Sequence, residues 1–167
     1  NGRSAIFGDK KLKIGQAHAS FMGQQIFPTR WRGQTMINEE QRAALIEAAI
    51  AVRTRAYAPY SNYPVGAALL MNDGTIFTGV NVENASYGLT ICAERTAVTK
   101  AVSEGYRKIL AVAVATDNAG SPCGACRQVL TEFAGDVPVY LVDTAGNGRD
   151  TSLHALLPDH FGLEHLT

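Results

Sequence analysis

The chain has 167 residues, of which 46% are hydrophobic and 18% charged, and its formal net charge is zero. This length suits one domain, and the composition excludes a disordered chain. The charge balance disfavours a dedicated nucleic-acid binder, and no apolar run reaches the roughly 18 residues that span a membrane. The odd count of three cysteines disfavours a disulfide framework. It favours reduced thiols, and hence a cytosol-like compartment or a metal site.

The first 35 residues differ from the rest of the chain. They contain six basic residues and one acidic residue, so this segment carries +5 and residues 36–167 carry −5. No hydrophobic periodicity is present before Met36. We therefore expect residues 1–35 to form a basic, flexible N-terminal extension, which is a tag, a transit peptide or an upstream extension. Residues 36–167 are expected to form the folded domain.

The domain is predicted to begin with a helix and a hairpin. Asn38 is a favourable helix N-cap, and Gln41 can complete a capping box. Apolar residues then recur on one face of a helix, which should end before Pro59 because the residue before a proline avoids the helical region. Two strands follow, over residues 64–71 and 75–80, joined by a turn at residues 72–74.

The remaining elements alternate between helices and strands. Small residues repeat every four positions from Ala93 to Ala101, which permits close packing of a helix on a sheet, and Gly105 ends this helix. The later predicted elements are a strand over 109–115, a helix over 123–133, a strand over 137–142 and a helix over 151–157. Alternation of this kind predicts an α/β fold with a mixed sheet and helices on both faces.

Three cysteines lie at the predicted starts of two helices. Cys123 and Cys126 form a CxxC pattern, and Cys92 begins the helix before it. Helix dipoles favour thiolates at these positions. By itself the CxxC pattern fits a redox pair, half of a zinc site or two buried thiols. Three thiolates with one open position match a catalytic zinc site, and Glu94 lies two residues beyond Cys92, where a carboxylate can move protons.

From about residue 38 to residue 166 the chain resembles the small homotetrameric cytidine deaminases. The matching motifs are Tyr57-Ala58-Pro59-Tyr60-Ser61, Val65-Gly66-Ala67-Ala68-Leu69, Asn81-Val82-Glu83-Asn84-Ala85-Ser86-Tyr87, Cys92-Ala93-Glu94-Arg95-Thr96-Ala97 and Ser121-Pro122-Cys123-Gly124-Ala125-Cys126-Arg127-Gln128. The resemblance implies a three-layer α-β-α sandwich with one Zn²⁺ per subunit and a homotetramer. It implies hydrolysis of cytidine and 2′-deoxycytidine to the uridines and ammonia, a step of pyrimidine salvage in the cytoplasm. The substrate is then a small nucleoside, with no nucleic-acid polymer and no membrane as partner.

The resemblance also implies roles for individual residues. Cys92, Cys123 and Cys126 match the zinc ligands, and Glu94 matches the proton shuttle. The residues that match substrate contacts are Asn81 and Glu83 at the ribose, Ala93 and Tyr63 at the base, and Tyr87 and Phe161. Tyr63 stands where the family usually has phenylalanine. Phe161 matches an aromatic residue that reaches a neighbouring subunit, although plain core packing explains it equally well.

Arg95 has an electrostatic rationale that is independent of the resemblance. Three thiolates and Zn²⁺ carry a net charge of −1, which weakens the metal as a Lewis acid. A guanidinium that donates to a thiolate sulfur offsets this excess charge. Arg127 can act in the same way, or it can form an ordinary salt bridge.

Other functions remain open from the sequence. The nearest is a deaminase of a modified cytosine nucleoside, which would share the zinc chemistry. A catalytically inactive zinc-binding module would have no need of Glu94, and a thiol–disulfide oxidoreductase would leave Cys92 without a purpose. A polynucleotide editor is disfavoured because the chain lacks a basic phosphate track.

Overall fold

The computed structural model describes residues 37–166, so the extension expected over residues 1–35 lies outside the described residues. In chain order the elements are α1 (Glu39–Arg53), β1 (Gly66–Met71), β2 (Ile76–Val80), η1 (Tyr87–Leu89), α2 (Ala93–Ser103), β3 (Ile109–Ala115), α3 (Gly124–Phe133), β4 (Pro138–Val142), β5 (Gly148–Ser152), α4 (Leu153–Leu156) and η2 (Leu163–His165). The expected capping box starts α1, because Asn38 and Gln41 exchange side-chain to backbone hydrogen bonds of 2.8 and 3.0 Å. Within residues 37–166, no helix is long and apolar enough to cross a membrane.

The strands form one mixed sheet in the order β2-β1-β3-β4-β5. β1 is antiparallel to both β2 and β3, whereas β3 and β4 are parallel and β5 returns antiparallel to β4. The predicted hairpin is therefore β1–β2, and the predicted parallel neighbours are β3 and β4. The α/β class with a mixed sheet is confirmed.

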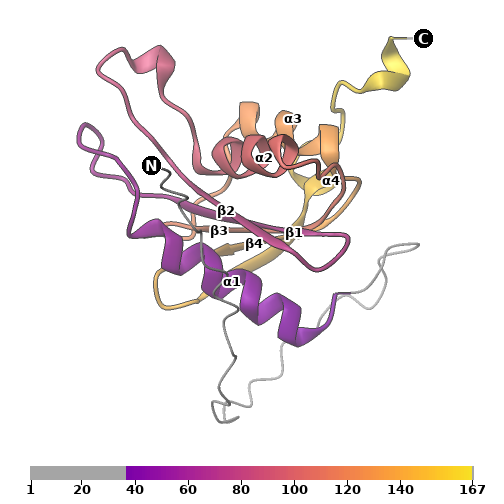
Figure 1. Ribbon diagram of the computed structural model, residues 1–167, viewed down its shortest axis with the longest axis horizontal. Helices are drawn as coiled ribbons and strands as arrows, with labels where there is room; N and C mark the ends of the chain where they lie inside the picture. Colours follow the sequence, from indigo (N-terminus) through magenta and orange to yellow (C-terminus); the bar gives the residue numbers. More distant parts are fainter. Residues whose placement is uncertain (1–36, 167) are drawn as a thin grey trace, which may run out of the picture. The chain divides into compact units, whose positions relative to one another are not determined.

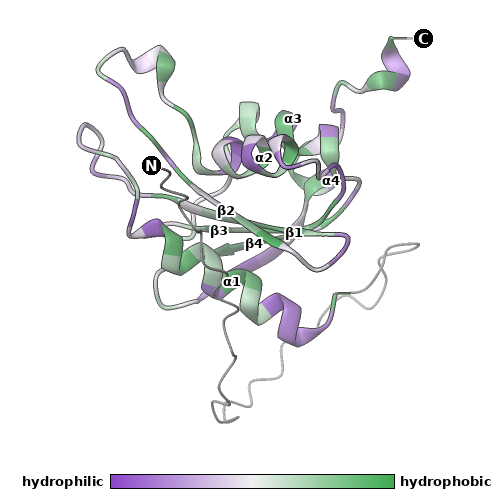
Figure 2. Ribbon diagram, viewed as in Figure 1, coloured by the Kyte–Doolittle hydropathy of each residue, from purple (hydrophilic) through white to green (hydrophobic). Residues whose placement is uncertain are grey.

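Helices cover both faces of the sheet (Figure 1), with α1 on one face and α2 and α3 on the other. Side chains of β1 alternate between the two faces: Leu69 packs in the core under α2 and α3, and Leu70 packs in the core under α1. Strands β1, β3 and β4 are consequently hydrophobic on both faces (Figure 2). This is why their sequences read as continuous apolar runs.

Two glycines allow the helices to lie close to the sheet. A Cβ at Gly66 would lie 2.1 Å from the carbonyl oxygen of Ala49 in α1. A Cβ at Gly79 would lie 2.4 Å from the backbone nitrogen of Ala97 in α2. The predicted stripe of small residues on α2 is fully covered, since Ala93 and Ala101 are also buried. This close packing fixes where the N-terminus of α2, with Cys92 as its N-cap, meets the rest of the molecule.

The helix predicted over residues 151–157 is wrong at its first two residues and at its last. Thr151 and Ser152 belong to β5, where they pair with Val139 and Pro138 of β4. Only Leu153–Leu156 is helical, and the Ser152 hydroxyl caps this turn by accepting from the amide of Ala155 at 3.1 Å. β5 is a mostly exposed, polar edge strand. It therefore lacks the apolar alternation by which a strand is recognised in sequence.

Candidate functional site

The sulfur atoms of three cysteines converge where two helices begin. Cys92 is the N-cap of α2, Cys123 is the N-cap of α3, and Cys126 lies in the first turn of α3. Their Sγ atoms all lie within 4.8 Å of one another, and those of Cys92 and Cys123 are 3.9 Å apart. Tetrahedral zinc–thiolate bonds of about 2.3 Å place two sulfurs about 3.8 Å apart. The donor set therefore fits Zn²⁺ with three protein ligands and a fourth, open position.

The electrostatics of the cluster favour a thiolate. Hydrogen bonding with the Cys126 thiol lowers the pKa of Cys92 to about 5, and the Arg95 guanidinium contributes in the same direction. The same contact with Cys92 raises the pKa of the buried Cys126. Cys92 is thus charged at neutral pH before any metal binds, which favours capture of a cation.

The two arginines of the cysteine motifs have different partners. Arg95 places Nη2 3.5 Å from Sγ of Cys92 and 3.2 Å from the carbonyl oxygen of Thr90. Arg127 makes none of the contacts considered for it from sequence. It donates to the carbonyl oxygens of Pro122 and Leu156, both at 2.8 Å, and to the hydroxyl of Ser121 at 3.0 Å. Arg127 therefore holds the backbone that leads into Cys123.

Glu94 is the buried carboxyl group next to the cluster. It lies in the first turn of α2, directly after the buried Ala93, and only 4% of its surface is exposed. Burial raises the pKa of Glu94, and the negative charge on Cys92 adds to the effect. A raised pKa makes the carboxylate a stronger base, which suits a group that must both accept and release a proton as a general base and acid.

Asn81 and Glu83 hold the loop between α1 and β1. The buried Asn81 amide accepts from the backbone of Val65 at 2.8 Å and donates to the carbonyl of Tyr63 at 2.9 Å. The Glu83 carboxylate accepts from the amides of Tyr60 at 2.8 Å and Ser61 at 3.3 Å. Hydrogen bonds from Ser61 and Tyr60 lower the pKa of Glu83, so it is ionised at neutral pH.

A pocket of about 370 Å³ opens beside this loop, lined by Tyr60, Ser61, Glu83, Tyr87 and Thr90. Thr90 connects the pocket to the cysteine cluster, because its carbonyl oxygen accepts from Arg95. No role was predicted from the sequence for Tyr60, Ser61 or Thr90. Tyr60 and Ser61 belong to the motif over residues 57–61, which contributes only to the family resemblance. Thr90 lies just before the motif that begins at Cys92.

Of the predicted substrate contacts, Glu83 and Tyr87 line this pocket, whereas Asn81, Ala93, Tyr63 and Phe161 do not. Tyr63 is 37% exposed, and its hydroxyl donates to Asn118 at 2.7 Å. Phe161 is 58% exposed on the C-terminal segment, so it is not a core residue. The side chain of Gln128 holds the Phe161 backbone at both its carbonyl, at 2.7 Å, and its amide, at 3.3 Å. Gln128 lies in the motif that contains Cys123 and Cys126, and the sequence does not predict this contact with Phe161.

The sequence and the fold are similar to those of known proteins. The family model "Cytidine and deoxycytidylate deaminase zinc-binding region" matches residues 39–142. The cytidine deaminase of Sporosarcina psychrophila is 54% identical over 118 residues, which cover 69% of this chain and 87% of the relative. The cytidine deaminase of Halalkalibacterium halodurans is 51% identical over 128 residues, 75% of this chain and 97% of the relative. The crystal structure of cytidine deaminase from Burkholderia pseudomallei aligns with a TM-score of 0.68 at 54% identity, over 71% of this chain and 98% of that one.

Proposed function

The chain belongs to the cytidine deaminase family, and from this premise we propose that it hydrolyses cytidine and 2′-deoxycytidine to uridine and 2′-deoxyuridine with release of ammonia. One observation carries the proposal. Three cysteine sulfurs converge at two helix N-termini, directly beside the buried carboxyl group of Glu94. Cys92, Cys123 and Cys126 are the proposed ligands of one Zn²⁺. Bound zinc polarises a water molecule and brings its pKa towards about 7.

Glu94 is the proposed proton carrier of the reaction. Its carboxylate takes a proton from the attacking water and delivers it to N3 of the cytosine ring. It then takes the proton of the new hydroxyl group at C4 and gives it to the amino nitrogen, so that the C4–N bond breaks, ammonia leaves and the C4 carbonyl forms. The raised pKa of the buried Glu94 supports this cycle, because the carboxyl group must hold each proton between accepting it from one atom and delivering it to the next. The backbone of Ala93, which is buried next to Glu94, is the proposed contact to the base.

Recognition of a nucleoside, and not a free base, is proposed to depend on the Asn81–Glu83 segment. Glu83 lines the pocket and is ionised at neutral pH, so its carboxylate can accept a hydrogen bond from a sugar hydroxyl. A site of this kind rejects a ligand without the hydroxyl, since its own polar groups would stay unpaired. Tyr87 from the same pocket and Tyr63 from the adjoining loop are proposed as aromatic contacts to the substrate. The net charge of −5 over residues 36–167 supports a small neutral substrate over a nucleic-acid polymer.

Assembly into a homotetramer is proposed from the exposed apolar side chains. Large hydrophobic residues are more than a third exposed on three segments of the described chain: Tyr57, Tyr60, Tyr63, Val82, Tyr87, Leu89, Ile91, Phe161, Leu163 and Leu166. The segment with η1 and the C-terminal segment both project from the sheet and its helices (Figure 1). Apolar surface of this extent is typical of an interface between subunits. Phe161 is then available to a neighbouring site, and sedimentation of the purified chain tests the tetramer.

A role in pyrimidine salvage within the cytoplasm is part of the same proposal. The three cysteines are free thiols, and a zinc–thiolate site requires them reduced. A reducing compartment meets this condition. The catalytic domain is proposed to span residues 36–167, which contain every residue named in the site.

The proposed reaction is tested by mixing purified, zinc-loaded protein with cytidine and measuring the loss of ultraviolet absorbance of the cytosine base. Glu94→Gln is expected to lower kcat by about 10²- to 10⁴-fold with the zinc content unchanged, because only proton transfer is lost. Glu104→Gln is the matched control, since Glu104 caps the other end of α2 and is exposed. An inactive wild-type enzyme would contradict the proposed reaction. Full activity of Glu94→Gln would contradict the proposed role of Glu94.

A further inference from the structure

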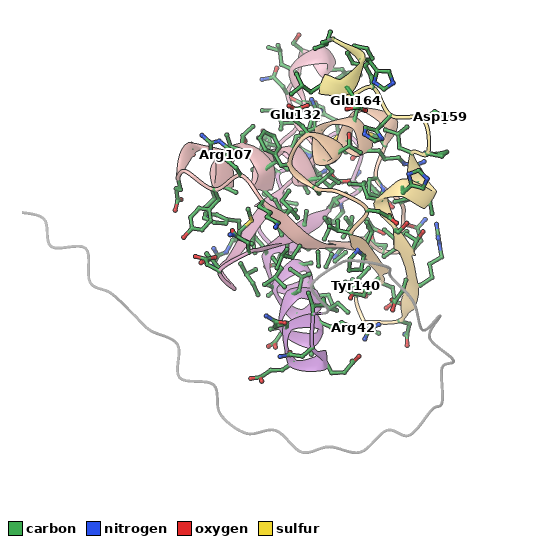
Figure 3. All side chains as sticks on the ribbon, turned by 90° about the vertical axis from the view of Figure 1, so that its right-hand side faces the viewer. Arg42, Arg107, Glu132, Tyr140, Asp159 and Glu164 are labelled. Atoms are coloured by element: carbon green, nitrogen blue, oxygen red, sulfur yellow. The ribbon has the colours of Figure 1, made fainter. Side chains whose placement is uncertain are left out.

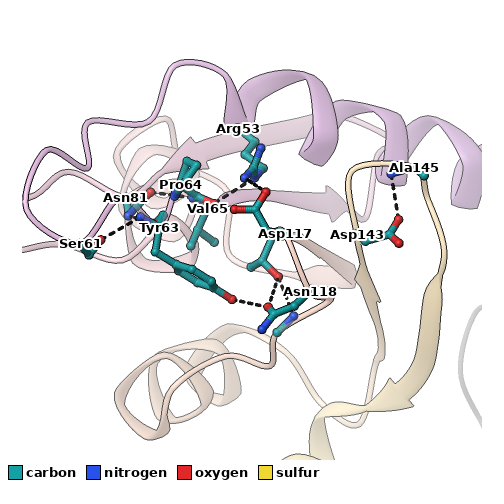
Figure 4. Close-up of polar contacts among 12 residues, drawn as sticks. Arg53, Ser61, Tyr63, Pro64, Val65, Asn81, Asp117, Asn118, Asp143 and Ala145 are labelled. Carbon is teal, nitrogen blue, oxygen red and sulfur yellow. Dashed lines mark hydrogen bonds and ion pairs between the residues drawn. The ribbon is translucent and has the colours of Figure 1, made fainter.

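The phenol of Tyr63 connects two segments that are distant in sequence. Tyr63 lies between α1 and β1, and its hydroxyl donates to Oδ1 of Asn118 at 2.7 Å. Asn118 belongs to the turn that follows β3, 55 residues further along the chain. Figure 4 shows the bond spanning the space between the two segments.

The turn at residues 116–120 is built around the same Asn118 oxygen. The buried Thr116 hydroxyl donates to it at 3.2 Å and accepts from the amide of Gly120 at 2.6 Å. Ala119 has a positive φ of 53°, which is unfavourable for a residue with a side chain. A Cβ at Gly120 would lie 2.6 Å from the Tyr63 hydroxyl. The Tyr63 hydroxyl therefore packs directly against the turn. The turn has glycine at position 120, the one residue type that lacks a Cβ and so leaves room for the hydroxyl.

Each end of this connection leads to a different part of the site. The turn runs through Ser121 and Pro122 into Cys123, and Arg127 holds that stretch by donating to the Pro122 carbonyl. At the other end, the backbone of Tyr63 is held by Asn81. Tyr60 and Ser61 of the same loop line the pocket and hold Glu83.

We propose that the Tyr63 hydroxyl is a positioning group. It fixes the pocket wall formed by Tyr60 and Ser61 relative to the loop that leads into Cys123. This inference rests on the deamination proposed above, since it concerns how the substrate is held for that reaction. Phenylalanine at this position would retain the aromatic ring and lose the link. The turn itself has a second attachment, because Arg53 pairs with Asp117 and donates to the Pro64 carbonyl at 3.0 Å (Figure 4). Loss of the Tyr63 hydroxyl is therefore expected to change the position of the pocket wall without disturbing the fold.

Steady-state kinetics with cytidine test the proposal. Tyr63→Phe is expected to raise KM about 3- to 10-fold, the effect of one lost hydrogen bond, while kcat stays within about twofold. The zinc content and Tm should remain those of the wild type, because Asn118 is exposed and water replaces the lost donor. Tyr106→Phe is the matched control: its hydroxyl lies 3.5 Å from that of Thr75, at the other end of the sheet from the cysteines, and KM should not change.

A double-mutant cycle distinguishes a link from two separate effects. Asn118→Ala alone should raise KM as Tyr63→Phe does, and the double variant should resemble either single variant. Additive effects in the double variant, or a wild-type KM in Tyr63→Phe, would overturn the positioning role while leaving the deaminase assignment intact. Absence of turnover in the wild type would instead overturn the proposed function, and this inference with it.

Discussion

Arg95 donates a hydrogen bond to the sulfur of Cys92, with Nη2 3.5 Å from Sγ. The two residues are one helical turn apart at the start of α2, and the same guanidinium also binds the carbonyl of Thr90. Three thiolates around Zn²⁺ would leave a net charge of −1, and the Arg95 guanidinium lies where it would offset part of that charge. A partner of a metal ligand commonly changes metal affinity or activity when it is removed.

Arg95→Ala is therefore expected to weaken zinc binding by about 10- to 100-fold. The measurement is the rate at which zinc passes to a chromophoric chelator. Arg107→Ala is the control, because Arg107 donates to the carbonyl of Val102 in the last turn of α2 and to that of Tyr106 just beyond it, at the far end of the helix from Cys92. Zinc release at the wild-type rate from Arg95→Ala would show that the hydrogen bond to Cys92 is not needed to retain the metal.

Gly66→Ala is expected to destabilise the fold. Its Cβ would lie 2.1 Å from the Ala49 carbonyl oxygen, which is backbone of α1 and cannot move without displacing the helix. The expected loss is about 1–3 kcal/mol in the free energy of unfolding, measured with urea. Gly135→Ala is the control, since nothing lies within 4 Å of its Cβ position. Equal stability of the two variants would contradict the close packing of α1 on β1.

The stability of the protein should fall at alkaline pH partly because of Tyr140. This side chain is buried on β4 with the Arg42 guanidinium 4.9 Å from its ring centroid (Figure 3). Burial, and then the charge of Asp150, raises the pKa of Tyr140 to about 12, above the value of about 10 in an unfolded chain. The unfolded state therefore loses this proton first as the pH rises, so the stabilising contribution is complete below about pH 10 and is lost towards about pH 12.

Tyr140→Phe removes this titration and should flatten the alkaline decline. The free energy of unfolding of both proteins, measured with urea from neutral pH to about pH 11, provides the comparison. Parallel declines in the two proteins would mean that Tyr140 titrates alike in the folded and unfolded states.

The strands and helices that form the core could be predicted because their signals are local. The apolar runs of β1, β3 and β4 and the capping box of α1 extend over only a few residues. β5 escaped prediction because it is a polar edge strand, stabilised by pairing with β4 and not by its own composition.

The cysteine motifs and Glu94 could likewise be identified from spacing within single helical turns. What only the tertiary structure decided is which distant residues meet. Cys92 lies 31 residues before Cys123, and their sulfurs come together because α2 and α3, whose N-caps they are, pack in the same core on one face of the sheet. The bond from Tyr63 to Asn118, and the commitment of Arg127 to backbone carbonyls instead of thiolates, have no local signature. Spacing along the chain determines the chemistry that a helix or loop can present, whereas a hydrogen bond between two loops depends on how the sheet brings them together.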